Sequence, residues 1–169
     1  MNIARPLIPL PEDIKLVQAL FLSVVSVTPV RTTGYWLLFR KTTWRLNEPF
    51  CFKIYATSRG RSYCYEITIK AGFETDFASI PKVFWWLYSP EDCRYNKAAI
   101  GHDILYAGEI FVKWFADDFL AMGMEDASRL NRWNFHKAVK WVGWFTYKGH
   151  TEESIEAARQ LLDMRVYMN

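Results

Sequence analysis

The first half of the chain places apolar and polar residues in the alternating pattern of β-strands. Residues 63–70 show this pattern most clearly, because every second position is apolar at Tyr65, Ile67 and Ile69. β-Branched and aromatic residues, which favour strands, also dominate residues 24–27, 35–39 and 50–55. Segments 47–49 and 58–61 carry turn residues, and the second has the length and glycine of a hairpin loop. We therefore expect an antiparallel sheet of hairpins over residues 31–80.

The first thirty residues allow two interpretations. Four prolines interrupt them, which favours an extended arm. Alternatively, residues 12–22 form a short helix with Pro11, Glu12 and Asp13 at its start. The longest apolar run, Leu16 to Val27, is too short to span a bilayer, so we expect no transmembrane segment.

After residue 80 the pattern becomes helical. Pro81 suits the first turn of a short helix, and longer helices are expected over residues 96–106, 110–122 and 127–142. A final helix should begin at the cap Thr151 and continue through Leu162. The expected fold class is α+β, with an amino-terminal antiparallel sheet followed by a carboxy-terminal bundle of about four helices over residues 81–169. A length of 169 residues suits a single domain.

Composition narrows the function classes. A formal net charge of +3 with scattered basic residues makes nucleic-acid binding an unfavoured function. The three cysteines form no C-x-x-C pair, which indicates a reducing compartment. Aromatic residues make up 17% of the chain, and aromatic residues are enriched in protein interfaces as well as in cores. Binding to other proteins, or to further copies of this chain, is therefore compatible with the composition.

The candidate chemistry lies in two helical segments. His102 and Tyr106 are four residues apart and share a helix face, with Asp103 beside them. A short connection should fold the next helix back so that Asp117 or Asp118 faces His102. An Asp at that place would orient the imidazole and make His102 a general base towards water. A structural hydrogen-bonded network between the helices is the competing interpretation.

A cation is a second hypothesis for the same region. Asp103, with Asp76 or backbone carbonyls, would supply oxygen ligands. Calcium or magnesium suits such ligands better than zinc, because no second His or Cys sits at ligand spacing.

The pattern His102-Asp103-x-x-Tyr106, followed by Asp117 within Ala-Asp-x-Phe, resembles the catalytic helix pair of secreted and prokaryotic phospholipases A2. This resemblance implies His102 as general base, Asp103 as calcium ligand, Tyr106 as support of the dyad and Asp117 as orienting carboxylate. The chain lacks that family's glycine-rich calcium loop and its flanking cysteines.

A longer resemblance covers residues 72 to about 122. The blocks Gly-Phe-Glu-Thr-Asp-Phe-Ala-Ser-Ile-Pro (72–81), Ala-Ala-Ile-Gly-His-Asp-Ile-Leu-Tyr (98–106) and Ala-Asp-Asp-Phe (116–119) occur in this order. Together they resemble a family of short phage and prophage proteins of unknown function. Lys113 departs from the pattern, since the family tends to carry Arg there.

The phage resemblance implies a virion-associated structural or accessory protein of the tail or head-tail region, present in the host cytoplasm during assembly and then in the virion. Its expected partners are other phage structural proteins. The alternative is a His/Asp-dependent, metal-assisted hydrolase acting on cell-envelope lipid or peptidoglycan, with His102 as general base. A small intracellular inhibitor of host defence is a third class.

Overall fold

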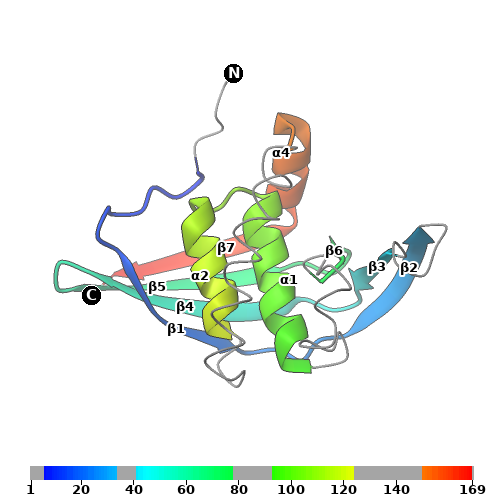
Figure 1. The fold of residues 1–169 in the computed structure, drawn as a ribbon, viewed down its shortest axis with the longest axis horizontal. Coiled ribbons are helices and arrows are strands. Elements are labelled where there is room, and N and C mark those ends of the chain that lie inside the picture. Colours follow the sequence, from blue (N-terminus) through cyan, green and yellow to red (C-terminus); the bar gives the residue numbers. More distant parts are fainter. Residues whose placement is uncertain (1–5, 34–40, 78–92, 124–149, 169) are drawn as a thin grey trace.

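The structure is a computed structural model that describes residues 6–33, 41–77, 93–123 and 150–168. Its main sheet has four strands in the order β1 (Lys15–Phe21), β4 (Phe50–Ser58), β5 (Arg61–Ile69) and β7 (Leu162–Met168). Every neighbouring pair in this sheet is antiparallel. Figure 1 shows β1 and β7 at its two margins.

A second sheet has three strands, β2 (Val27–Thr33), β3 (Lys41–Leu46) and β6 (Glu74–Thr75), in the order β2-β3-β6. The strand β6 is only two residues long and pairs Thr75 with Trp44. This short pairing fixes the chain immediately before Asp76 and Phe77.

The alternation along β4 and β5 produces one buried face of the main sheet. Phe52 lies opposite Ile67 and Ile54 opposite Tyr65, and all four side chains are buried. The intervening positions form the other face, where Lys53 Nζ and Glu66 Oε2 form an ion pair at 2.9 Å. The strand pattern expected over residues 50–55 and 63–70 is therefore confirmed.

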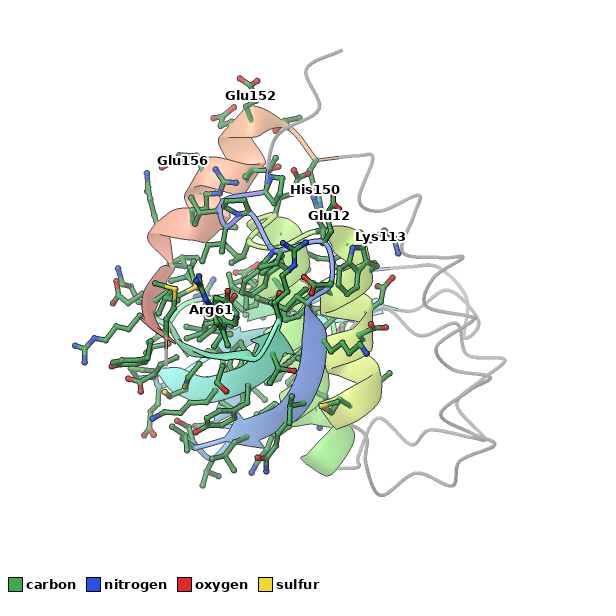
Figure 2. The ribbon with its side chains drawn as sticks, turned by 90° about the vertical axis from the view of Figure 1, so that its left-hand side faces the viewer. Glu12, Arg61, Lys113, His150, Glu152 and Glu156 are labelled. Atoms are coloured by element: carbon green, nitrogen blue, oxygen red, sulfur yellow. The ribbon has the colours of Figure 1, made fainter. Side chains whose placement is uncertain are left out.

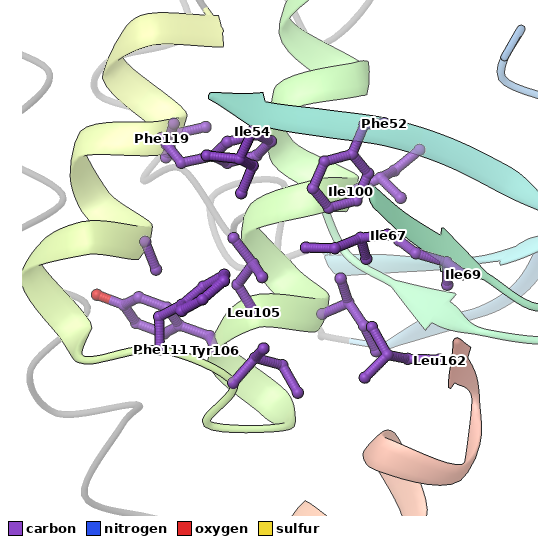
Figure 3. Packing of buried hydrophobic residues seen from close by; sticks show 14 of the residues in the cluster. Phe52, Ile54, Ile67, Ile69, Ile100, Leu105, Tyr106, Phe111, Phe119 and Leu162 are labelled. Atoms are coloured by element: carbon purple, nitrogen blue, oxygen red, sulfur yellow. The ribbon is translucent and has the colours of Figure 1, made fainter. Parts of the chain in front are cut away.

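The buried face is covered by the antiparallel helices α1 (Cys93–Ala107) and α2 (Lys113–Gly123), as Figure 1 shows. Figure 3 shows Phe119 of α2 next to Ile54 and Phe52 of β4, with Ile100 and Leu105 of α1 completing the layer. Gly101 permits this packing, since a Cβ there would lie 2.7 Å from the Phe119 ring. Within the described residues, no helix is both long and apolar enough to cross a membrane.

The expected fold class is wrong. The described residues contain three helices, not a bundle of about four, and the strands are not confined to the amino-terminal half. The last helix, α4 (Glu152–Gln160), begins at the predicted cap Thr151 with a complete capping box, but it ends before Leu162. Leu162 then starts β7, because this apolar position is buried against the main sheet beside Ile69.

The helix considered for residues 12–22 is also wrong, because β1 occupies residues 15–21. Its pairing with β4 buries the Ala19 and Phe21 face against the core, a contact that single-sequence helix signals do not report. The expected strand at 35–39 and the helices expected after Pro81 and over 127–142 lie outside the described residues.

Candidate functional site

Asp117 is the centre of a buried polar cluster between α1 and α2. Its Oδ1 accepts a hydrogen bond from the Tyr106 hydroxyl and lies 3.5 Å from His102 Nε2. Its Oδ2 accepts a hydrogen bond of 2.7 Å from Lys113 Nζ, one helical turn earlier on α2. Both carboxylate oxygens are thus occupied by groups of this chain.

The turn between the helices puts these groups together. The amide of Ile110 donates to the Leu105 carbonyl, and α2 begins three residues later. This tight reversal places Lys113 opposite the end of α1, where its ammonium lies 5.3 Å from the centre of the Tyr106 ring. Figure 2 labels Lys113 at the start of α2.

The other ring nitrogen of His102, Nδ1, lies near Asp103, and Asp103 in turn contacts Thr75 at the end of β6. His102 Nδ1 lies 3.7 Å from Asp103 Oδ1, which is an ion-pair distance but too long for a hydrogen bond. Asp103 Oδ2 accepts a hydrogen bond of 2.5 Å from Thr75 Oγ1. Thr75 Oγ1 in turn accepts from the backbone amide of Phe77, whose φ of 56° is left-handed. The cluster therefore joins the loop after β6 to α1.

Burial and neighbouring charges act in opposite directions on the pKa values of His102 and Asp117. Burial by itself lowers the pKa of His102, but the carboxylates of Asp103 and Asp117 outweigh burial and raise this pKa above its usual 6.5. Burial also raises the pKa of Asp117, yet hydrogen bonds from His102, Lys113 and Tyr106 outweigh it and lower that pKa below 3.8. These shifts favour a protonated His102 beside an ionised Asp117.

The cluster has little contact with solvent. His102 is 5% exposed, Tyr106 4% and Asp117 2%. The side chains at its edge, Asp103 and Lys113, are 16% and 19% exposed. Charges this deeply buried persist only when they are paired. His102 lies at ion-pair distance from both Asp103 and Asp117, although its Nδ1 has no hydrogen-bond acceptor among the described residues.

The structure brings together four of the residues singled out from the sequence: His102, Asp103, Tyr106 and Asp117. Lys113 and Thr75 were not given roles in the site from the sequence. The spacing of Lys113 and Asp117 by four residues was an available signal. The Thr75 to Asp103 contact joins residues 28 positions apart and had no local signal.

The predicted cation site stays a prediction. Asp76 is half-buried in the turn between Thr75 and Phe77. Within the described ranges, no group of three or more His, Cys, Asp or Glu side chains is arranged to hold a metal ion.

A separate hollow of about 550 Å³ lies where α4 meets the loop between β5 and β6. Its lining residues are Arg45, Gly72, Phe73, Glu74, Ala157, Ala158 and Leu161. None of them belongs to the polar cluster. Arg45 and Glu74 pair with each other at 2.8 Å, so their charges are already compensated.

The fold and the cluster define the class of protein: an antiparallel sheet backed by a helix pair that encloses a charged network. Residues 44–139 match the family model described as "Protein of unknown function (DUF1353)". The match covers more than half of the chain, so the chain belongs to this family. It contains every member of the cluster, whereas β1, β2, α4 and β7 lie outside it. No curated protein and no solved structure matches the chain.

Proposed function

We propose that this chain is a phage-encoded, virion-associated structural or accessory protein of the tail or head-tail region. It would be made in the host cytoplasm and then enter the particle with other phage structural proteins. The phage origin rests on the resemblance carried by the three blocks within residues 72–119. The observation that carries a structural role is that both oxygens of Asp117 accept hydrogen bonds from groups of this chain, while Asp117 itself is only 2% exposed.

The protonation state supports the same proposal. A general base must accept a proton and must reach a substrate or a water molecule. The raised pKa of His102 favours the protonated imidazole, which cannot accept a further proton, and the ring is 5% exposed. The cluster is therefore better suited to holding α1, α2 and the loop after β6 together than to abstracting a proton.

The proposed docking surface for other phage proteins is an apolar strip on β1 and the segment after it. Its members, with their exposed fractions, are Val17 (54%), Leu20 (40%), Leu22 (51%) and Val24 (82%). Four large apolar side chains exposed within eight residues form a patch of the kind that marks interaction sites. The strip follows the amino-terminal segment, whose Leu7 and Ile8 amides donate to the Glu109 and Ile110 carbonyls.

Mass spectrometry of purified phage particles tests this proposal. We expect the chain to be present in particles, and the double substitution Leu22→Ser with Val24→Ser to lower its incorporation by at least tenfold. Val30→Ser, which changes a 43% exposed apolar residue on β2, is the matched control and should leave incorporation unchanged. Complete absence of the wild-type chain from particles would refute virion association.

A second candidate is the His/Asp-dependent hydrolase acting on cell-envelope lipid or peptidoglycan. The observation that favours it is the contact of His102 Nε2 with Asp117 on a neighbouring helix, at 3.5 Å. In that case His102→Ala should abolish hydrolysis of phospholipid vesicles or peptidoglycan while the melting temperature changes little. This candidate would be excluded if the wild-type protein hydrolysed neither substrate and His102→Ala only lowered the melting temperature.

A further inference from the structure

The strand β7 forms one margin of the main sheet. On its inner side it pairs with β5 without a register shift, from Leu162 opposite Ile69 to Met168 opposite Tyr63. On its outer side no described strand is paired with it. An open edge presents unpaired N–H and C=O groups that can hydrogen-bond to another strand, so native proteins usually block such edges.

The margin strands β1 and β2 are interrupted and β6 is only two residues long, whereas β7 is neither interrupted nor short. The β1 strand has a register shift between Leu16 and Gln18, and β2 carries Pro29 at a similar shift. Bulges and prolines are two devices that prevent edge pairing. In β7 neither device occurs, and the apolar residues Val166, Tyr167 and Met168 are exposed by 43%, 46% and 70%.

We propose that β7 pairs antiparallel with β7 of a second copy of this chain, so that two four-stranded sheets become one sheet of eight strands. A two-fold axis perpendicular to the sheet passes between the two Val166 residues, so that Val166 of one copy lies opposite Val166 of the second copy. In an antiparallel pair, two residues that lie directly opposite each other point to the same face of the sheet. The core faces of both copies therefore lie on the same side of the joined sheet. Tyr167 then lies opposite the second copy's Arg165, where ring and guanidinium attract each other.

Charge and chain geometry select this register over its neighbours. An axis at Arg165 would place two guanidinium groups directly opposite each other, which is destabilising. An axis at Met164 would oppose Asp163 and Arg165 favourably, but it would put Met168 opposite Gln160, the last residue of α4, where the strand has ended. The Val166 register covers all three exposed apolar residues and stays within the strand.

The proposed contact is small. It joins residues 164–168 of each copy, fewer residues than a standard interface contributes from each partner. We therefore expect a dimer that dissociates on dilution. This inference is independent of virion association, since β7 and the apolar strip on β1 lie at opposite margins of the sheet.

Disulfide trapping tests the register. In the proposed dimer two Val166→Cys residues face each other at a Cα separation of about 4.5–5.5 Å, within the range for a disulfide. We expect oxidation to give covalent dimers of this variant. Arg165→Cys is the matched control, because its two copies are displaced along the strands beyond disulfide reach and its partner on β5 is Glu66. A cysteine at position 167 would not serve, since Tyr167 lies opposite Cys64 of its own chain. The wild-type chain controls for Cys51, Cys64 and Cys93. Monomeric Val166→Cys, or equal cross-linking of all three proteins, would overturn the proposal.

Sedimentation of the full chain tests the association itself. The wild-type protein should approach twice its 19.9 kDa mass as concentration rises. Val166→Lys, which places two like charges opposite each other at the axis, should remain at 19.9 kDa with a nearly unchanged melting temperature, because the position is 43% exposed. A wild-type protein that stays monomeric at every concentration would overturn the proposal.

Discussion

At the residue scale, Asp117 decides whether the polar cluster is stable. Removing its charge leaves the ammonium of Lys113 and the imidazolium of His102 without their shared counter-ion in a buried place. Loss of one partner of a buried ion pair typically costs about 3–5 kcal/mol. The isosteric change isolates this electrostatic effect because it keeps the shape of the side chain.

We therefore predict that Asp117→Asn lowers the free energy of unfolding by about 3 kcal/mol or more, measured by urea denaturation. Asp163→Asn is the control, since its side chain is 70% exposed and forms an ion pair with the half-exposed Lys70. Surface pairs of this kind contribute about 0–1 kcal/mol. Equal effects of the two substitutions would contradict a central role for Asp117.

His102 makes stability depend on pH. Its folded-state pKa is raised above 6.5 by the two carboxylates, after burial has opposed them. Protonation therefore stabilises the folded state. This contribution is complete below pH 6.5 and is lost as the pH rises through the raised pKa of the folded protein.

We predict that the free energy of unfolding of the wild-type protein decreases as the pH rises from 6.5 through the raised pKa of His102, and that His102→Gln removes this decrease. Urea denaturation at a series of pH values measures both proteins, and NMR titration of the His102 ring gives its folded pKa. If His102 titrates below 6.5, the cluster does not hold an imidazolium and the sign of the effect is reversed.

At the element scale, the packing of α1 on α2 depends on Gly101. Replacing glycine by alanine within a helix normally stabilises by about 1 kcal/mol. Here the added Cβ would lie 2.7 Å and 2.8 Å from two atoms of the Phe119 ring. The ring is itself enclosed by Phe21 and Phe52, so it has little room to move.

We predict that Gly101→Ala destabilises the protein by about 1–3 kcal/mol, the usual cost of overpacking, despite its better helix propensity. Adding Phe119→Leu should recover part of the loss, which a double-mutant cycle of thermal unfolding measures. Additive effects of the two substitutions would show that the close contact is not the cause.

Sequence signals predicted helices and strands correctly where the signal lay within a few neighbouring residues. The cap Thr151 marks the start of α4 because the capping box lies within four residues. The alternation along β5 was readable because side chains of a strand point to opposite faces. The end of α4 was not readable, since Leu161 and Leu162 continue the helical apolar spacing and only the pairing with β5 makes residues 162–168 a strand.

At the scale of the whole molecule, β7 returns the end of the chain to the sheet. Its ladder with β5 connects segments separated by about a hundred residues, and Leu162 is buried at its start. Without β7, the backbone groups on the outer side of β5 lose their partners and the core beside Ile69 is opened.

We predict that deletion of residues 162–168 abolishes cooperative unfolding, as followed by circular dichroism in urea. A triple substitution of Val166, Tyr167 and Met168 by Ala, which removes exposed side chains but keeps the ladder, should retain a cooperative transition. A cooperative transition at the wild-type urea concentration after the deletion would show that β7 does not contribute to the core.

The sequence by itself determined the features that depend on near neighbours: the β4 and β5 hairpin, the cap of α4, and the shared helix face of His102 and Tyr106. Tertiary structure decided the rest. Only packing could place Thr75 on Asp103, turn the end of the chain into β7, and enclose His102 between two carboxylates so that its proton is retained. The physical reason is that burial and long-range pairing set these outcomes, and both depend on residues far away in the chain.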